Sequence, residues 1–196
     1  MLIFATNNQN KVDEIKSILT GLIDVCSLRE ANIDIDIPEP HDTLEENATE
    51  KSRAIFNITG KDCFSEDTGL EVIALNGEPG VKSARYASEE ALYKNNTDKL
   101  LHQLNGVQNR EAQFKTIISL MLGGKEYQFQ GLCKGIITTQ EFGENGFGYD
   151  AVFIPEGSNK TFAEMTMEEK NKFSHRKKAV AKLISFLKDK KWEELN

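Results

Sequence analysis

The sequence has few cysteines, few prolines and no long uninterrupted apolar stretch. Its three cysteines, Cys26, Cys63 and Cys133, are odd in number, widely spaced and free of any CxxC pair, which excludes a disulfide framework and a cysteine-based zinc site. No apolar run approaches the ~20 residues of a membrane-spanning helix. The first residues lack the basic leader of a signal peptide. These absences predict a cytoplasmic protein with no membrane partner.

Positive charge is also scarce. The 196 residues include 24 lysines and arginines against 31 acidic residues, which gives a formal net charge of −7. Proteins that bind DNA or RNA rely on a basic face, so the composition argues against a nucleic-acid partner. A small anionic ligand such as a nucleotide is still compatible, because it needs only a few local cations and backbone N–H groups.

Two common nucleotide-binding motifs are missing as well. The sequence contains neither the GxxxxGK[ST] loop nor a GxGxxG fingerprint, which argues against a P-loop protein and a simple dinucleotide-binding fold. With 39% hydrophobic residues, the chain can build one sizeable core. Any nucleotide site must therefore be sought in other motifs.

An acidic motif, SEDTGL at residues 65–70, is the candidate reactive centre. A short apolar run precedes it and another follows, so we expect a strand to break there, with Glu66 and Asp67 in the break. Paired carboxylates in such a place suit a divalent cation or the activation of a water molecule. A solvated acidic turn is the alternative interpretation.

A polar loop, TNNQNK at residues 6–11, separates a predicted buried strand at residues 2–5 from an amphipathic helix that ends at Gly21. The N-terminus of a helix offers N–H groups and the positive end of its dipole, and Lys11 adds a charge. The loop is predicted to cradle phosphates. A capped helix with a solvated lysine would give the same pattern.

Two further charged residues are candidates. Isoleucines and aspartates alternate over residues 33–37, which predicts a half-buried strand, and the prolines after it hold Glu39 in a stiff turn as a candidate metal ligand. A capping box at Thr43 begins a helix that ends at Gly60 and carries Lys51, which could reach a phosphate. An exposed loop acid and a solvated lysine are the alternatives.

The central part of the chain predicts a mixed sheet. The apolar run at residues 116–122, the glycine pair at 123–124 and the alternation that follows indicate a long antiparallel hairpin over residues 112–137. A helix is expected over residues 88–104. Together with the strand, loop and helix at the start of the chain, these elements indicate an α/β fold.

Near the C-terminus, a glycine-rich loop and the start of the last helix are candidate binding elements. The loop, GENGFGYD at residues 143–150, can bring backbone close to a ligand and stack an aromatic ring on a base. His175 and Arg176 follow Ser174 in the first helical turn, where the helix dipole disfavours positive charge, and this mismatch hints at a ligand. A mobile loop and a surface His–Arg pair are the alternatives.

Taken in order, five motifs resemble the inosine/xanthosine triphosphate pyrophosphatase family. They are TNNQNK at 6–11, ENA at 46–48 with Lys51, SEDTGL at 65–70, PGVKSARY at 79–86, and GFGYD at 146–150 with SHR at 174–176. The resemblance implies an α/β fold: a long twisted mixed sheet flanked by helices, forming one domain at residues 1–196 with two lobes and a central substrate cleft. It also implies Mg²⁺-dependent hydrolysis of ITP, dITP and XTP to the monophosphate and pyrophosphate, by a homodimer that removes deaminated purines from the nucleotide pool.

The family's functional residues carry over onto matching positions. Asp67 matches the catalytic acid and a metal ligand, Glu39 matches a second metal ligand, and Glu66 is expected to help hold the metal. The expected substrate-binding residues are Thr6, Asn7, Asn8, Gln9, Asn10, Lys11, Lys51, Thr68, Phe147, Gly148, Tyr149, Asp150, Lys170, His175 and Arg176. Two departures from the family pattern, an Asn-Asn pair at 7–8 in place of Gly-Asn and Ala151 in place of proline, remove no chemical group that the reaction needs.

Two other functions fit parts of the pattern. One is a nucleotide-sensing module that binds without hydrolysis, and the intact acid pair counts against it. The other is a Maf-like pyrophosphatase for modified pyrimidine or methylated nucleotides, and the five-motif match counts against that one.

Overall fold

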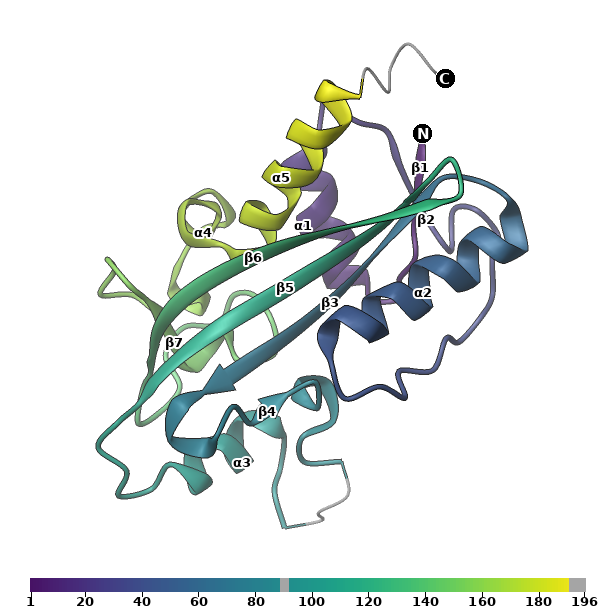
Figure 1. Cartoon of the computed structure of the whole chain (residues 1–196). Coiled ribbons are helices and arrows are strands. Elements are labelled where there is room, and N and C mark those ends of the chain that lie inside the picture. Colours follow the sequence, from purple (N-terminus) through teal and green to yellow (C-terminus); the bar gives the residue numbers. More distant parts are fainter. Residues whose placement is uncertain (89–91, 191–196) are drawn as a thin grey trace. The chain divides into compact units, whose positions relative to one another are not determined.

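The computed structural model describes residues 1–88 and 92–190 of the chain. Its helices are α1 (Gln9–Leu19), α2 (Leu44–Thr59), α3 (Asn96–Gln103), α4 (Met167–Phe173) and α5 (His175–Asp189) (Figure 1). Its strands are β1 (Leu2–Phe4), β2 (Val25–Ser27), β3 (Cys63–Val72), β4 (Pro79–Gly80), β5 (Glu111–Leu122), β6 (Lys125–Ile137) and β7 (Phe153–Pro155). The chain is therefore an α/β protein.

The strands form one mixed sheet in the order β2-β1-β3-β5-β6-β7, with β4 paired to β3. β1 pairs in parallel with β2 and with β3, whereas β4 is antiparallel to β3 and β7 is antiparallel to β6. Gly123 and Gly124 join β5 to β6 with φ angles of 55° and 78°, and a connection of two residues allows only antiparallel strands. The predicted long hairpin is confirmed.

The chain divides into two compact units. Of the described residues, unit 1 contains 1–67, 116–131 and 176–190, and unit 2 contains 68–88, 92–115 and 132–175. Strands β3, β5 and β6 contribute residues to both units. Each unit has its own hydrophobic core.

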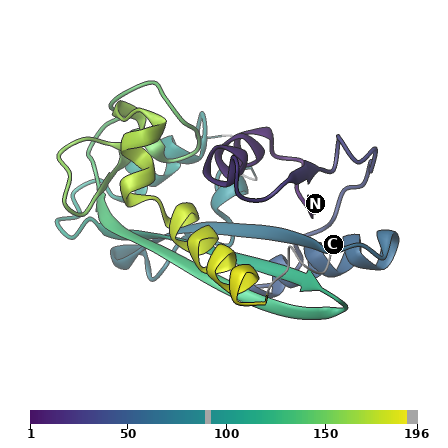
Figure 2. The ribbon, with the colours of Figure 1, turned by 90° about the horizontal axis from the view of Figure 1, so that it is seen from above.

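Unit 1 packs helices on both faces of its strands. One core joins α1 and α5 to Leu2, Phe4 and Phe64, with the Phe4 and Phe64 rings stacked at 4.6 Å. The other core joins Ile55 of α2 to residues such as Ile3, which points the opposite way from its neighbours in β1. Figure 2 shows α5 along the β5–β6 pair, where Phe186 contacts the rings of Tyr127 and Phe129. Side-chain alternation along β1 and β3 therefore assigns each residue to the α1/α5 face or to the α2 face.

Unit 2 has a core rich in aromatic rings. Phe114 of β5 packs edge-on against Phe153 of β7 at 4.7 Å, and Phe162 stacks against Phe114 at 6.1 Å. Leu100 and Leu104, in and next to α3, are fully buried in the same core. This packing holds the loop that precedes β7.

Helix boundaries follow local signals in the sequence. The Thr43 side chain accepts a hydrogen bond from the Glu46 N–H, as the predicted capping box requires. Gly60 closes α2 with a left-handed φ of 63°. Both predicted ends of this helix are confirmed.

Three expectations about secondary structure are wrong. The predicted break at residues 65–69 does not occur, because β3 continues from Cys63 to Val72. Residues 33–37 have the predicted alternation of half-buried isoleucines and exposed aspartates, yet they form no strand, since within the described residues they join no sheet ladder. The helix expected from residue 88 begins only at Asn96, capped by the Asn95 side chain, while residues 89–91 of that expectation lie outside the described part.

Among residues 1–88 and 92–190, no helix has both the length and the apolar character needed to cross a lipid bilayer.

Candidate functional site

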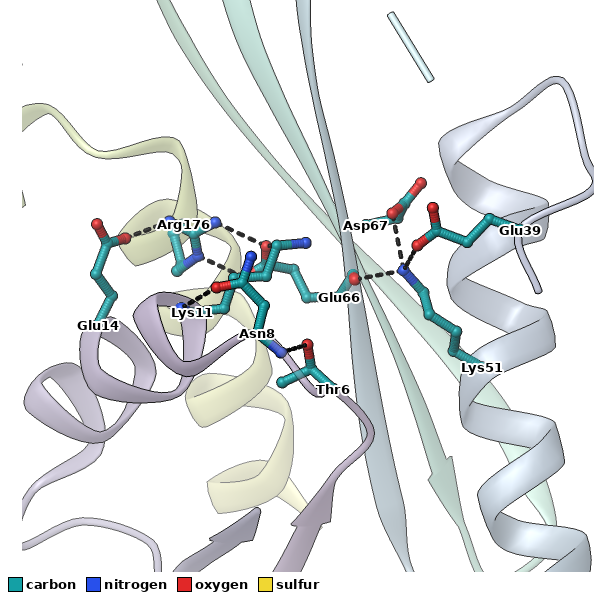
Figure 3. A network of polar contacts seen from close by, with 9 residues as sticks. All are labelled: Thr6, Asn8, Lys11, Glu14, Glu39, Lys51, Glu66, Asp67 and Arg176. Atoms are coloured by element: carbon teal, nitrogen blue, oxygen red, sulfur yellow. Dashed lines mark hydrogen bonds and ion pairs between the residues drawn. The ribbon is translucent and has the colours of Figure 1, made fainter. Parts of the chain in front are cut away.

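The acidic motif lies within β3, and its residues alternate between the two faces of the sheet. Cys63, Ser65 and Asp67 turn toward α2: the Cys63 thiol and the Ser65 hydroxyl donate to carbonyl oxygens of that helix. Glu66 turns toward α1 and α5, as does Phe64. Figure 3 shows the Glu66 and Asp67 carboxylates on opposite sides of the strand. The two neighbouring acids therefore belong to two different sets of contacts.

On the α2 face, Lys51 joins the two predicted metal-binding acids. Its ammonium donates to Asp67 Oδ1 at 2.8 Å, to Glu39 Oε1 at 2.8 Å and to the Glu66 carbonyl oxygen at 2.9 Å (Figure 3). Lys51 is only 7% exposed. Three oxygen atoms thus converge on one position, which the ammonium nitrogen marks.

Burial and charge together set the pKa values of this cluster. Burial raises the pKa of Asp67 above its ordinary value, Lys51 and Lys11 oppose that rise, and Glu39 adds to it. Burial lowers the pKa of Lys51, but Asp67 and Glu39 outweigh burial, so the net effect is a raised pKa. One ammonium therefore stays charged between two carboxylates, and the cluster has one excess negative charge that suits a further cation.

On the opposite face, Glu66 is held by Arg176. Arg176 donates from Nε to Glu66 Oε2 at 2.5 Å and from Nη2 to Oε1 at 2.8 Å, and from Nη1 to the Glu14 carboxylate (Figure 3). Lys11 Nζ lies 3.4 Å from Glu66 Oε1. Burial alone lowers the pKa of Arg176, but the Glu66 and Glu14 carboxylates outweigh it and raise the pKa above its ordinary value. The Arg176 side chain therefore has the Glu66 and Glu14 carboxylates as partners. Its predicted contact with the nucleotide base stays a prediction.

The predicted phosphate loop is ordered by its own side chains. Asn8 caps α1 by accepting a hydrogen bond from the Lys11 N–H at 3.2 Å, and Thr6 Oγ1 accepts from the Asn8 N–H at 3.2 Å. Asn7 Nδ2 donates to the Ile35 carbonyl at 2.8 Å. Ile35 lies in the segment that leads to Glu39, so one hydrogen bond ties the loop to that segment. Gln9 pairs with Asp13, and Asn10 is exposed.

A hollow of about 590 Å³ lies beside this loop within unit 1. Thr6, Asn7 and Gln9 form one side of it, and Arg29 contributes a cation from the segment after β2. Sequence reasoning missed Arg29, because nothing in the local pattern links it to the loop. The hollow has the size of a small-molecule site.

In unit 2, the glycine-rich loop is organised by Asp150. Its Oδ2 accepts from the Phe147 N–H at 2.9 Å and from Lys170 Nζ at 2.7 Å. Gly146 has a φ of 76°, and a Cβ there would lie 2.1 Å from Asp150 Oδ2, so only glycine allows this approach. The Lys170 ammonium also lies 5.3 Å from the centre of the Phe147 ring. The Phe147 ring is half-buried.

The other predicted substrate-binding residues of unit 2 have ring contacts, hydrogen bonds or partial burial within that unit. The His175 ring stacks on Phe114 at 4.6 Å with an angle of 16° between the planes, and it is 3% exposed. Tyr149 is buried and donates to the Ser83 carbonyl at 2.9 Å. The exposed Gly148 accepts from Thr97 at 3.2 Å, and Thr68 is half-buried on β3. The alternative of a surface His–Arg pair is wrong, because His175 and Arg176 are both buried.

The predicted ligand set contains no ready-made metal cage. Within the described residues, no three His, Cys, Asp or Glu side chains are grouped so that they could hold a metal ion. Asp67, Glu39 and the Glu66 backbone carbonyl meet at the Lys51 ammonium, while the Glu66 carboxylate lies on the other face. Carboxylate and carbonyl oxygens are the donors that Mg²⁺ prefers, and Mg²⁺ is often bound by one or two carboxylates together with substrate phosphates. The donor set fits such a shared site.

Sequence reasoning also missed Glu14. This acid is 4% exposed on α1 and contacts the Arg176 guanidinium. A charged residue between Val12 and Ile15 of the apolar face was the available signal. Its partner lies 162 residues away in the chain, which no local pattern reveals.

Comparison with known sequences gives a consistent family. The sequence model of the Ham1 family matches residues 2–186. The dITP/XTP pyrophosphatase of Flavobacterium johnsoniae is 53% identical over 186 residues, covering 95% of this chain and 97% of that protein. The dITP/XTP pyrophosphatase of Porphyromonas gingivalis is 48% identical over 187 residues, covering 95% and 96% of the two chains.

Solved structures agree. The Ham1 protein of Staphylococcus aureus superposes with a TM-score of 0.85 and is 39% identical, covering 96% of this chain and 98% of that chain. A HAM1 protein from Coxiella burnetii gives a TM-score of 0.85 at 34% identity, with coverage of 96% and 100%. The similarity therefore extends over nearly the whole fold.

Proposed function

The chain belongs to the Ham1 family, and from this membership we propose that it hydrolyses dITP, XTP and ITP to the nucleoside monophosphate and pyrophosphate. The observation that carries the proposal is the Asp67–Lys51–Glu39 cluster, in a chain 53% identical to a dITP/XTP pyrophosphatase over 95% of its length. Such an enzyme removes deaminated purine nucleotides from the nucleotide pool.

We propose Mg²⁺ as the cofactor. The carboxylates of Asp67 and Glu39 would hold it beside the Lys51 ammonium, because both acids contact that ammonium at 2.8 Å and carry two formal negative charges against its one. When bound, the ion supplies neutralisation of the triphosphate and of charge that develops at the attacked phosphorus. Phosphate oxygens would complete its coordination.

Asp67 is the proposed base. Its burial raises its pKa, and a carboxylate with a raised pKa takes a proton from water more readily than an ordinary aspartate does. A water molecule oriented by Asp67 attacks the α-phosphorus, and pyrophosphate leaves intact. Lys11 and the N-terminal turn of α1 hold the phosphate tail, since both offer positive charge.

Base recognition is assigned to residues of unit 2. Lys170 is a donor next to the Phe147 ring of the glycine-rich loop, and His175 is a second, buried donor that stacks on Phe114. Such donors suit the 6-oxo group of hypoxanthine and xanthine. Adenine presents an amino group at the same position, and a buried donor left without an acceptor costs about 1–3 kcal/mol. Guanine also has a 6-oxo group, so its rejection depends on the 2-position of the ring.

A homodimer and a cytoplasmic location complete the proposal. The family resemblance supports the dimer, and the cysteine usage supports a reducing compartment. Sedimentation of the purified protein at micromolar concentration tests the dimer directly.

The experiment is pyrophosphate release from ITP, dITP, XTP, ATP and GTP, with and without Mg²⁺. We expect rapid release from the first three only, and only with Mg²⁺. Nucleotide binding without any release would favour the sensing module. Release confined to modified pyrimidine or methylated nucleotides, assayed in parallel, would favour the Maf-like alternative.

A further inference from the structure

Glu66, next to the proposed base, has surroundings of its own. Its side chain is fully buried, and its carboxylate accepts both hydrogen bonds of the Arg176 fork. The ammonium of Lys11 also lies 3.4 Å from Glu66 Oε1. The carboxylate therefore links the last helix to the first turn of α1 (Figure 3).

These contacts form a linked set of charges within unit 1. Lys11 and Glu14 lie three residues apart on α1 and share a face of that helix. Glu14 contacts Arg176, Arg176 holds Glu66, and Glu66 faces Lys11. Two positive and two negative charges balance, which limits the cost of burying them.

Lys11 is the exposed end of this set. Its side chain is 15% exposed, compared with 0% for Glu66, 2% for Arg176 and 5% for Glu14. A separation of 3.4 Å is longer than an ordinary hydrogen bond, so the ammonium is oriented by charge and keeps room to donate to a phosphate oxygen. The three buried members thus determine where an accessible ammonium sits.

We propose that Glu66 is a positioning residue that orients Lys11 for the triphosphate and contributes no carboxylate oxygen to the metal site. This inference rests on the proposed function for the identity of the ligand. It assigns the two acids of the motif separate tasks: Asp67 serves the metal and the water on the α2 face, and Glu66 serves the phosphate-binding lysine on the α1/α5 face.

Glu66→Gln has two opposite expected effects on ligand binding, one from the loss of its negative charge and one from the loss of the Lys11 orientation. The substitution removes a negative charge near an anionic ligand, and charge alone would tighten binding. Loss of the Lys11 orientation would weaken binding, since losing a hydrogen bond to a charged group raises a Kd about 10- to 150-fold. If Glu66 positions Lys11, the net effect of the substitution must be weaker binding of the ligand.

The test measures the Kd of a non-hydrolysable α,β-methylene analogue of dITP over a range of Mg²⁺ concentrations. We expect Glu66→Gln to raise the Kd about tenfold or more, with the half-saturating Mg²⁺ concentration unchanged. Asp67→Asn is expected to raise that Mg²⁺ concentration. The Kd of the double variant Lys11→Met, Glu66→Gln should differ less than twofold from that of Lys11→Met alone, because the ammonium that Glu66 orients is already absent.

Two controls separate position from stability. Leu187→Ala removes a buried apolar side chain from the other end of α5 and should lower the melting temperature while the Kd stays within twofold of wild type. Glu66→Asp keeps the charge but withdraws the carboxylate by one methylene, and should raise the Kd by an intermediate factor. If Glu66→Gln does not fold, Glu66→Asp and its double variant with Lys11→Met decide the question.

An unchanged or lower Kd for the Glu66 variants would overturn the proposal, as would a rise in the half-saturating Mg²⁺ concentration. Wild-type turnover of dITP, run alongside, reports on the proposed function separately. Binding of the analogue without turnover would refute the hydrolase while the ratio of Kd values still decides the role of Glu66.

Discussion

Lys51 is a buried ammonium between two carboxylates, and its replacement by methionine tests whether that cluster is organised by charge. Methionine keeps most of the side-chain volume but removes the donor to Asp67, Glu39 and the Glu66 carbonyl. Asp67 is 5% exposed, so its carboxylate would lose its principal neutralising partner away from water. Removing one partner of a buried ion pair costs about 3–5 kcal/mol.

The assay is urea denaturation at pH 7 combined with thermal melting. For a domain of this size each kcal/mol lowers the melting temperature by about 2–4 °C, so the expected fall is about 6–20 °C. Lys16→Met is the matched control, because Lys16 forms an ion pair with Glu30 at 2.6 Å in which the side chains are 37% and 51% exposed. Exposed ion pairs contribute little to folding stability, so this variant should have the same melting temperature as the wild type.

Added Mg²⁺ gives a second reading of the same variant. A divalent cation can take the position that the ammonium leaves between the two carboxylates, and a ligand that binds only the folded state stabilises it. We expect Mg²⁺ to raise the melting temperature of Lys51→Met more than that of the wild type. Equal melting temperatures for Lys51→Met and Lys16→Met would refute the idea that charge organises the cluster. So would a Mg²⁺-induced rise in melting temperature that is no larger for Lys51→Met than for the wild type.

Three further predictions follow from single contacts. Asp67→Asn should slow pyrophosphate release from dITP at least ~100-fold, the lower range for loss of a general base; turnover near that of the wild type would contradict the role of Asp67. Burial, with a contribution from Asp62, raises the pKa of Cys63 to about 12, so its thiolate is scarce at pH 8. A thiol reagent should label half-buried Cys26 in the folded protein and reach Cys63 only in urea, whereas equal rates would disprove the assignment. Gly69→Ala places a Cβ 2.5 Å from the Gly80 carbonyl oxygen and should lower the free energy of unfolding by about 1–3 kcal/mol, which an unchanged urea midpoint would refute.

Patterns that depend on neighbours in the chain were predictable from the sequence. The capping residue Thr43, the terminal Gly60 and the turn at Gly123 and Gly124 each act within a few residues, and the structure has all of them. The isoleucines at 33, 35 and 37 face the core as their alternation predicts. Alternation identifies the face that is buried, but it carries no information on a hydrogen-bonding partner, so the expected strand was wrong.

The acidic motif shows where local reasoning fails. Charged residues followed by Thr-Gly favour a turn when they are considered in isolation. In the structure they are part of β3, because residues from other elements form ion pairs with the two acids. Glu66 is 110 residues from Arg176, and Asp67 is 16 residues from Lys51. Tertiary contacts of this kind override propensity, and once β3 is a strand its alternation turns the two acids to opposite faces.

In the proposed reaction, water oriented by Asp67 attacks the α-phosphorus. The most direct measurement is hydrolysis of dITP in ¹⁸O-labelled water, with the products analysed by mass spectrometry. The account predicts one ¹⁸O atom in the deoxyinosine monophosphate and none in the pyrophosphate. Label in the pyrophosphate, or release of inorganic phosphate in its place, would contradict it.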